Sequence, residues 1–599
     1  MMEYSALVDV YDRLGATESN NRKRDILAET LQQADGSQLP RLVTLVRGRL
    51  SPAHDRTELG VSSSLTLDAI LRATGASEPG VREQWQKTGD LGDAAAWATE
   101  HASQQTLFSE TLTVERVHDR LRELATFEGD GSQDRRVQAV SGLLADASPD
   151  EARYVVRTAL GHMRVGIGEG TIRDAIAVAF LDGSDRAAET VEAAYQVTND
   201  YRTVAETARD EGQNGLHDLE VEPFRPVQVM LAQKGESLPE TLTDAAEDNQ
   251  ALCEYKYDGV RVQIHVADGD ARVYTRRLQD VTEAFPDVVR VVEDGVETPA
   301  ILDGELVGYT PETITNDAPA RDPVAFQKLS QRIKREYGIA GMTQEVPVIV
   351  HLFDCLYDGR SLIRESLDSR LDRLDDVTRS VAPDLQTSET NAQPDGPDTQ
   401  IDSGPITNHD LTTAGLERAR AVRVTPAEPA PAESLYQEAL EAGHEGLMIK
   451  NLEAPYDPGR RVGRLLKVKP TMEPLDLVVT RATYSEGRRS GLLGRLHLGC
   501  YDADQSQFRE VGRLSTGYTD EQLEALTTRL ESHVTTRDER QLQLEPAIVL
   551  EVEYEEIQES PEYDSGFALR FPRFLNVRED LNPSDTDTLA RVEQLYENQ

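Results

Sequence analysis

The chain has 599 residues, 38% of them apolar, and a formal net charge of −44 from 63 Lys and Arg against 107 Asp and Glu. This length suggests roughly three to five domains. Taken alone, so acidic a balance argues against nucleic acid as a partner, because nucleic-acid-binding surfaces are usually basic. No apolar run approaches the ~18 residues of a transmembrane helix, and the first residues lack the basic and apolar regions of a signal peptide.

The basic residues are unevenly chosen, since nine of them are lysine and 54 are arginine. Few lysines, many carboxylates and little apolar content favour adaptation to molar salt over an ordinary acidic protein. In molar salt the Debye length is ~3 Å, so repulsion between an acidic surface and DNA is mostly screened. The lysines that such a composition retains are good candidates for function.

The three cysteines, Cys253, Cys355 and Cys500, are far apart and form no CxxC pair. This spacing argues against a zinc finger and a disulfide framework, and it fits a reducing cytoplasm.

Residues 1–222 have a helical pattern. Val114, Val117, Leu121 and Leu124 follow the 3–4 spacing of one buried helix face. Residues 150–164 and 171–180 show a similar spacing and are separated by the glycine-rich break at 166–168. We therefore predict a helical N-terminal domain.

The pattern changes near residue 223. Residues 260–266 alternate between β-branched and polar side chains, as in a half-buried strand. Asp258-Gly259 and Asp268-Gly269 are predicted to be hairpin turns. Residues 223–472 are therefore expected to form a mixed α/β domain with antiparallel sheets. Within it, the acidic, proline-rich segment 380–432 is expected to be a partly disordered insert.

From residue 473 to 599 strand patterns dominate again, which suits a small β-barrel. The predicted fold class is thus multidomain α+β, with boundaries near 222 and 472.

The most informative string is EYKYDGVR at 254–261. Lys256 is expected at the end of one strand, just before a turn, with Arg261 on the returning strand. Taken alone, K-x-D-G is a weak signal, and an ordinary hairpin with scattered charges is the alternative. Glu254 and Arg261 strengthen it, and the strings downstream strengthen it further.

Five more strings follow in order: LDGE at 302–305, LFDCLY at 352–357, EGLMIK at 445–450, LKVK at 466–469 and RFPRF at 570–574. Together with the first, they resemble the ordered motifs of the covalent nucleotidyltransferases, which comprise DNA ligases, RNA ligases and mRNA capping enzymes. The resemblance covers nearly the whole chain and is closest to archaeal and eukaryotic replicative ligases.

The resemblance implies one nucleophile, Lys256, with ATP as co-substrate and Mg²⁺ as metal. It places Glu254 at the adenine amino group, Phe353 stacked on adenine, Glu305 at the ribose or the metal, Arg461 and Lys467 at phosphates, Glu445 at Mg²⁺, and Arg261 and Arg276 among the nucleotide-binding residues. Three of these assignments have a plainer alternative: Phe353 as core, Arg277 in place of Arg276, and Glu445 as a solvated charge.

The chemistry explains these residue types. Lysine is a nucleophile only when neutral, and its reference pKa is ~10.4. Nearby cations and partial burial lower that pKa, so we expect Arg261, Arg276, Lys467 and a metal near Lys256. The amine attacks the α-phosphate in line as pyrophosphate leaves, and positioned cations stabilise the charge that spreads over the phosphate oxygens.

The last motif departs from the family pattern. By the resemblance, Arg570 and Arg573 serve the leaving pyrophosphate. The family usually reads R-x-D-K after RFPRF, whereas here Arg578-Glu579-Asp580 is followed by Leu581. Either the two arginines suffice, or triphosphate binding is weaker.

The N-terminal half distinguishes family members, because capping enzymes and small RNA ligases lack a long helical domain. MRVGIG at 163–168 and RPVQVMLA at 225–232 resemble strings of replicative DNA ligases, whose helical domain would grip the minor groove mainly through phosphates. The cysteines exclude the zinc module of NAD-dependent ligases, which favours ATP. Gln104–Phe108 lies where related archaeal ligases place a sliding-clamp peptide, and a plain loop is the alternative.

These observations predict a cytoplasmic, monomeric ATP-dependent DNA ligase that seals nicks in double-stranded DNA during replication, repair and recombination. We predict three domains: a helical DNA-binding domain at 1–222, an adenylylation domain at 223–472 and an OB-fold at 473–599. Together they would catalyse a reaction of three steps. Lys256 takes AMP, the AMP passes to a 5′-phosphate, and a 3′-hydroxyl displaces it. Two rivals remain, an RNA ligase or GTP-using capping enzyme, and a catalytically silent DNA clamp, against which Lys256, Glu305, Glu445 and Lys467 argue.

Overall fold

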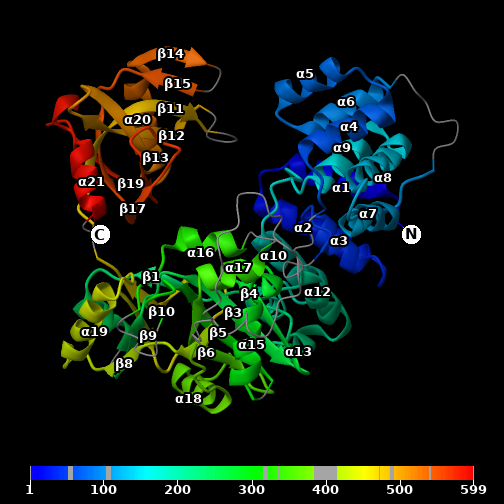
Figure 1. The fold of residues 1–599 in the computed structure, drawn as a ribbon. Helices are drawn as coiled ribbons and strands as arrows, with labels where there is room; N and C mark the ends of the chain where they lie inside the picture. The colour runs from blue at the N-terminus through cyan, green and yellow to red at the C-terminus, as the bar shows by residue number, and fades with distance from the viewer. Residues whose placement is uncertain are drawn as a thin grey trace, which may run out of the picture. The chain divides into compact units, whose positions relative to one another are not determined.

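A computed structural model describes residues 2–597, with gaps at 52–58, 103–109, 247–248, 298, 315–320, 334–337, 384–413, 460, 471, 486–490 and 539–540, and without the side chains of 327, 340, 461 and 462. The chain forms two compact units, Met1–Val468 and Lys469–Gln599 (Figure 1). The second unit begins close to the predicted boundary at 472. The predicted boundary at 222 stays a prediction, since residues on both sides belong to the first unit.

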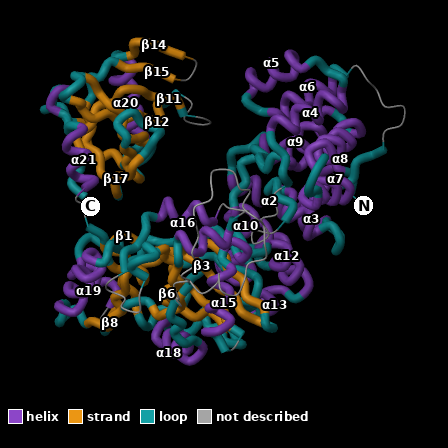
Figure 2. The backbone as a smooth tube through the Cα atoms, in the orientation of Figure 1, coloured by secondary structure: helices purple, strands orange, loops and turns teal. Residues whose placement is uncertain are grey.

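The N-terminal part of the first unit is helical, as predicted (Figure 2). Its elements are α1 (Tyr4–Gly15), α2 (Asn20–Gln33), α3 (Leu39–Leu45), α4 (Ser63–Thr74), α5 (Glu78–Thr88), α6 (Leu91–Glu100), α7 (Val114–Glu123), η1 (Leu124–Thr126), α8 (Ser132–Asp146), α9 (Pro149–Ala159), α10 (Glu169–Phe180), α11 (Asp185–Thr198), α12 (Tyr201–Asp210) and α13 (Gly212–His217). No helix in the described part of the chain is both long and apolar enough to cross a membrane.

Local sequence explains where these helices begin and end. The Thr113 hydroxyl accepts a hydrogen bond from the Arg116 amide and caps α7. A capping box between Ser148 and Glu151 begins α9. This helix ends before the predicted residue 164, because Gly161 takes the left-handed conformation that commonly ends a helix.

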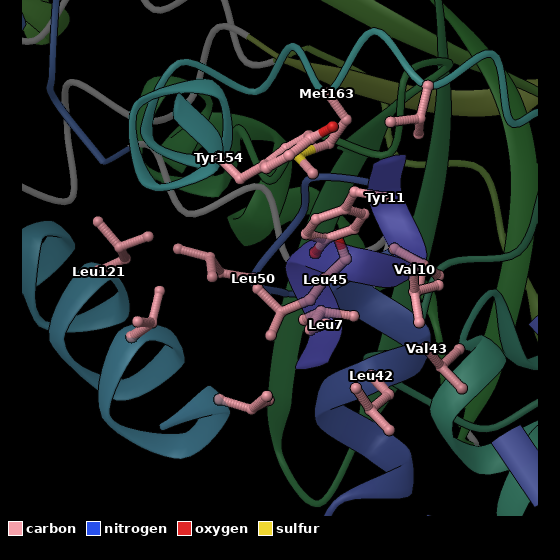
Figure 3. Packing of buried hydrophobic residues seen from close by; sticks show 14 of the residues in the cluster. Leu7, Val10, Tyr11, Leu42, Val43, Leu45, Leu50, Leu121, Tyr154 and Met163 are labelled. Carbon is pink, nitrogen blue, oxygen red and sulfur yellow. The ribbon is translucent and has the colours of Figure 1, made fainter. Parts of the chain in front are cut away.

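The helical core packs around two aromatic rings (Figure 3). The centroids of Tyr11 and Tyr154 are 4.7 Å apart. The Tyr11 hydroxyl donates to the Leu45 carbonyl oxygen at 3.0 Å, and the Tyr154 hydroxyl donates to Asp12 at 2.7 Å. These bonds satisfy the polar ends of rings whose apolar bodies join α1, α3 and α9.

The central part of the first unit contains two five-stranded sheets and their covering helices. The first sheet has the order β1 (Leu231–Lys234), β10 (Arg461–Val468), β9 (Leu447–Asn451), β2 (Ala251–Tyr255) and β8 (Ala421–Val424). The second has the order β4 (Asp270–Thr275), β3 (Val260–Ala267), β5 (Ala300–Gly308), β6 (Val348–Tyr357) and β7 (Gly415–Arg418). The helical elements are α14 (Leu238–Ala246), η2 (Thr282–Ala284), α15 (Pro286–Gly295), α16 (Phe326–Ile333), α17 (Ile339–Glu345), α18 (Leu367–Val377) and α19 (Ala430–Glu441).

Both sheets are mainly antiparallel, as expected, with parallel pairs only between β1 and β10 and between β6 and β7 among the described strands. Each sheet buries one apolar face. Cys253, Leu447 and Ile449 of the first sheet pack with α14 and α19. Val262 and Leu302 of the second sheet belong to a core that includes residues of α15 and α18. Alternation of side chains leaves the opposite faces free to carry polar groups.

One of the two predicted hairpins is confirmed and the other is wrong. Asp268 and Gly269 both have positive φ and join β3 to β4, as a tight two-residue hairpin requires. Asp258-Gly259 instead carries the chain from β2 in the first sheet to β3 in the second. A side chain at 259 would meet the Leu306 carbonyl oxygen at 2.5 Å, so glycine is required for a close crossing rather than for a hairpin.

The predicted insert at 380–432 is corrected at its C-terminal end. Residues 384–413 lie outside the described part, but residues 415–424 form β7 and β8, and α19 begins at Ala430. Proline occupies the first turn of α19, where its missing N–H costs nothing. A signal interpreted as a disordered loop was therefore partly a helix start.

The second unit is the predicted OB-type β-barrel domain. Its elements are β11 (Leu475–Tyr484), β12 (Leu493–Asp502), β13 (Gln507–Leu514), α20 (Asp520–Glu531), β14 (Val534–Asp538), β15 (Gln541–Leu544), β16 (Val549–Glu553), β17 (Glu556–Glu559), β18 (Phe567–Arg570), β19 (Arg573–Val577), η5 (Pro583–Asp585) and α21 (Leu589–Glu597). Every strand pair described in it is antiparallel. One apolar core, which includes Leu496, Leu550 and Phe574, holds the unit together.

Candidate active site

Lys256 follows directly after β2 and meets Glu445, which precedes β9. The Lys256 amide donates to the Gly446 carbonyl oxygen at 2.8 Å, and the Glu445 amide donates to the Lys256 carbonyl oxygen at 2.9 Å. These bonds place the two side chains together, and the ammonium forms an ion pair with the Glu445 carboxylate. Gly446 has a φ of 125°, which favours glycine within EGLMIK.

The polar face of the first sheet carries the next group. Glu254, Met448 and Lys467 lie opposite one another across β2, β9 and β10, so their side chains share one face. Lys450 lies two residues along β9 on the same face, and its ammonium forms an ion pair with Glu254. Glu254 is 2% exposed, so this pair is shielded from solvent.

The second sheet supplies a matching row. Arg261, Glu305 and His351 lie opposite one another across β3, β5 and β6. Arg261 makes a bidentate pair with buried Asp303, at 3.0 and 2.6 Å, and donates to the Met230 carbonyl oxygen at 2.6 Å. The guanidinium is therefore held rigidly before any nucleotide arrives.

Glu305 is electrostatically unusual. Burial raises its pKa to about 8, Lys256 and Arg261 act to lower the pKa, and Glu445 acts to raise it. Two carboxylates and the proposed nucleophile therefore influence one another across the space between the sheets. A buried carboxylate with so high a pKa is typical of functional sites.

Phe353 lies where the two sheets approach each other. The Lys450 ammonium lies 4.4 Å from its ring centroid and comes from the first sheet. The Arg261 guanidinium carbon lies 5.5 Å from the same centroid and comes from the second. The ring is partly buried, and its cationic neighbours contact it as cation–π partners.

For other predicted site residues, the structure gives fewer side-chain contacts. Arg276 and Arg277 are both exposed after β4, and the Arg276 amide donates to the Arg261 carbonyl oxygen at 3.0 Å. Arg461 begins β10, but its side chain lies outside the described part. Lys256 was expected to lie among cations. In the structure its ammonium contacts the Glu445 carboxylate, and Arg261 forms an ion pair with Asp303.

An aromatic group lies beside the nucleophile. The Tyr257 ring stacks on His351 at 4.1 Å and meets His444 edge-on at 4.8 Å. Its hydroxyl accepts a hydrogen bond from the Arg420 amide at 3.0 Å. Burial lowers the pKa of His351 and lowers that of His444 to about 3, so both rings are neutral and pack against Tyr257, the residue after Lys256.

The motif of residues 570–574 belongs to the second unit. Arg570 ends β18 and pairs with Glu556 at 3.1 Å, and its guanidinium carbon lies 5.4 Å from the Phe571 ring centroid. Phe571 is 62% exposed with a φ of 50°. Arg573 is exposed at the start of β19. Arg578 pairs with Asp580 and Asp476, so this part of the divergent R-E-D-L string is engaged within its own unit.

The sequence did not assign roles to Lys450, Asp303 or Tyr456. The Tyr456 hydroxyl donates to Asp303 at 2.9 Å and so belongs to the Arg261 network. Lys450 could have been found, because it ends the EGLMIK string and is one of only nine lysines. No local signal pointed to Tyr456, because its contact joins positions 153 residues apart.

Two sheets with facing polar sides, a lysine at the end of a strand and the ordered motifs define the class of covalent nucleotidyltransferases. The known proteins narrow this class. The family model described as "DNA ligase N terminus" matches residues 3–177, "ATP dependent DNA ligase domain" matches 229–399 and 417–469, and "ATP dependent DNA ligase C terminal region" matches 489–581. The chain belongs to the ATP-dependent DNA ligase family.

Relatives match along the full length. A protein named DNA ligase from Thermococcus fumicolans is 38% identical over 598 residues, which cover 99% of this chain and 98% of the relative. A DNA ligase from Haloarcula marismortui is 39% identical and covers 100% of both chains. A solved structure named Pmar-Lig_PreS3 matches 95% of this chain and 99% of its own, with a TM-score of 0.54. At 16% identity, that likeness shows the fold alone.

Proposed function

We propose that Lys256 is the residue adenylylated during nick sealing, and that the two facing sheets form its ATP site. The lysyl-AMP mechanism is that of the family to which the chain belongs. The observation that carries the assignment is the junction at Lys256, where one strand end presents the amine beside Glu445 and within the electrostatic reach of Glu305.

The nucleotide roles follow from the two polar faces. Glu254 receives the adenine amino group, Phe353 stacks on the base, and Glu305 lies at the ribose or the metal. Arg261, Arg276, Arg461 and Lys467 supply positive charge to the triphosphate. The rigid Arg261–Asp303 pair supports this proposal, because a cation fixed in advance stabilises phosphoryl transfer without reorganising.

Glu305 and Glu445 would hold Mg²⁺. In the described part of the chain no group of three or more His, Cys, Asp or Glu could hold a metal alone. Two carboxylates nevertheless fit Mg²⁺, which is usually bound by one or two carboxylates, waters and substrate phosphates. Burial raises the pKa of Glu305, and a bound cation would favour its ionised form. When bound, Mg²⁺ supplies charge neutralisation at the phosphates.

The substrate proposed for the whole chain is nicked double-stranded DNA, sealed during replication, repair and recombination. The helical domain would grip the duplex through phosphate contacts. The sliding-clamp peptide proposed at Gln104–Phe108 lies outside the described residues. We further propose that the protein acts as a monomer in the cytoplasm of a salt-adapted cell.

A pulse-chase experiment tests the proposed reaction. Incubation with α-labelled ATP and Mg²⁺ should yield labelled protein on a denaturing gel, and a chase with nicked duplex DNA should move the label to DNA and seal the nick. Label that forms with GTP in preference to ATP would favour a capping enzyme, and sealing confined to RNA would favour an RNA ligase. Absence of label under all conditions would support the silent DNA clamp.

A further inference from the structure

The ion pair between Lys450 and Glu254 occupies the place proposed for adenine. Both side chains lie on the inner face of the first sheet, and the Lys450 ammonium lies 4.4 Å from the centroid of the Phe353 ring. Without nucleotide, a cation therefore covers the ring on which the base is proposed to stack. Lys450 must shift when a base enters, while Glu254 stays at the end of the base.

The chemical state of Glu254 decides which base it accepts. An ionised carboxylate only accepts hydrogen bonds, whereas a protonated one also donates. The 6-amino group of adenine is a donor, and the 6-oxo group of guanine or hypoxanthine is an acceptor. A carboxylate therefore selects adenine, and a carboxylic acid accepts either base.

The surroundings of Glu254 oppose its ionisation. Burial raises its pKa, Lys450 and Arg418 act to lower it, and Asp354 acts to raise it. Burial and the nearby charge of Glu254 raise the pKa values of Cys253 and Tyr257, so these two groups are neutral. Arg418 forms its own ion pair with Asp375 at 3.0 Å, so Lys450 is the cation in direct contact with Glu254.

We propose that Lys450 is a specificity-determining residue, which holds Glu254 in the carboxylate form that accepts adenine and rejects 6-oxopurines. This inference rests on the proposed placement of adenine at Glu254 and Phe353. It assigns Lys450 a task distinct from nucleophilic attack and from phosphate binding.

The test compares label transfer from α-labelled ATP and α-labelled inosine triphosphate (ITP), which carries the 6-oxo group without the 2-amino group of guanine. Lys450→Met removes the ammonium and keeps much of the side-chain length, and Lys450→Arg keeps the charge. Lys328→Met is the matched control, since it removes an exposed lysine from α16. For each variant, kcat/KM is measured with both nucleotides between pH 6 and pH 8.5.

Lys450→Met should raise the ITP-to-ATP ratio of kcat/KM by about tenfold or more, as expected for a charged hydrogen-bond preference. The ratio should rise further as pH falls, because an unpaired Glu254 takes up a proton. Lys450→Arg and Lys328→Met should keep the wild-type ratio. Equal losses with both nucleotides, or a raised ratio that does not change with pH, would overturn the proposal.

Lys450→Met leaves a buried carboxylate without its partner, so it could fail to fold. The double variant Glu254→Gln/Lys450→Met avoids this problem, because a neutral amide both donates and accepts. It should show a raised ITP-to-ATP ratio at every pH, and an unchanged ratio would contradict the inference. Failure of the proposed adenine placement looks different, because Phe353→Ala would then form the labelled adduct with ATP at the wild-type rate.

Discussion

Glu305 is a carboxyl group in surroundings that disfavour its charge. Its pKa is about 8 in the folded protein, against an ordinary value of 4.5. Between these values the folded state holds a proton that the unfolded state has lost, so this residue makes stability fall as pH rises from about 4.5 to 8. Above that range the loss is complete.

Glu305→Gln should therefore reduce the fall in Tm between about pH 5 and pH 8, measured without divalent metal. Glu312→Gln, which replaces an exposed carboxylate close by in the chain, should leave the wild-type slope unchanged. If Glu305→Gln and wild type lose Tm in parallel across this range, Glu305 is ionised in the folded state and its proposed environment is wrong.

At the scale of elements, one buried pair joins α18 to β6. Arg370 makes a bidentate pair with Asp354, at 2.7 and 2.9 Å, and the side chains are 3% and 7% exposed. Arg370→Met should lower the free energy of unfolding by about 3–5 kcal/mol, because it leaves an uncompensated buried charge. Urea denaturation of the full chain measures the change.

Arg373 on the same helix supplies the control, because it is 39% exposed and pairs with Asp358. Arg373→Met should cost no more than ~1 kcal/mol. The double variant Asp354→Asn/Arg370→Met should recover part of the stability lost in Arg370→Met. If the double variant loses as much stability as Asp354→Asn and Arg370→Met lose together when each is measured alone, the pair itself contributes nothing.

The arginines of residues 570–574 can be tested without deleting their strand. Removal of residues 565–599 would take away β19, which pairs with β16 inside the barrel. Arg573→Ala removes an exposed side chain and should slow formation of the labelled adduct by about 100-fold, as expected for loss of a charge aimed at the leaving group. Sealing of a pre-adenylylated nick should change little.

Arg529→Ala on α20 is the matched control, since it removes a partly exposed arginine from the same unit. It should leave both reactions unchanged. If Arg573→Ala slows sealing of the pre-adenylylated nick as much as adduct formation, the arginine serves DNA binding or a later step, and not the leaving pyrophosphate.

Elements with a strong local pattern were predictable. The spacing of Val114, Val117 and Leu121 predicted α7, and Asp268-Gly269 predicted the turn between β3 and β4. Asp258-Gly259 was misjudged, because the same dipeptide serves a crossing between sheets that only tertiary structure reveals. The prolines at the start of α19 were misjudged because proline favours both loops and the first turn of a helix.

The site was predictable as a set of residues but not as a set of pairs. Motif order identified Lys256, Glu254 and Glu445 as functional candidates. It could not show that Lys256 meets Glu445 or that Glu254 meets Lys450, because these contacts join positions 189 and 196 residues apart along the chain. Strand register determines both pairs, and register is a property of the assembled sheet.

For the whole molecule, the net charge of −44 dominates the response to salt. In ~0.1 M salt the Debye length is ~10 Å and repulsion among surface carboxylates is strong, whereas molar salt screens it. Tm and nick-sealing rate should therefore both be higher in ~2–3 M KCl than in ~0.1 M KCl.

Sucrose provides a control for this prediction, because it stabilises folded proteins by exclusion from their surface but does not screen charge. Added to ~0.1 M KCl, sucrose should raise Tm less than molar KCl does. Full stability and activity in ~0.1 M KCl would contradict salt adaptation.

The amine of Lys256 is the nucleophile of the proposed reaction, and Lys256→Arg tests that role most directly. Arginine keeps the charge, but its guanidinium stays protonated and cannot form the phosphoramidate. With α-labelled ATP and Mg²⁺, the wild-type chain should become labelled at Lys256 and Lys256→Arg should show no adduct. A labelled adduct in Lys256→Arg, or peptide mapping that places AMP on Lys450, Lys467 or Lys469, would contradict the assignment.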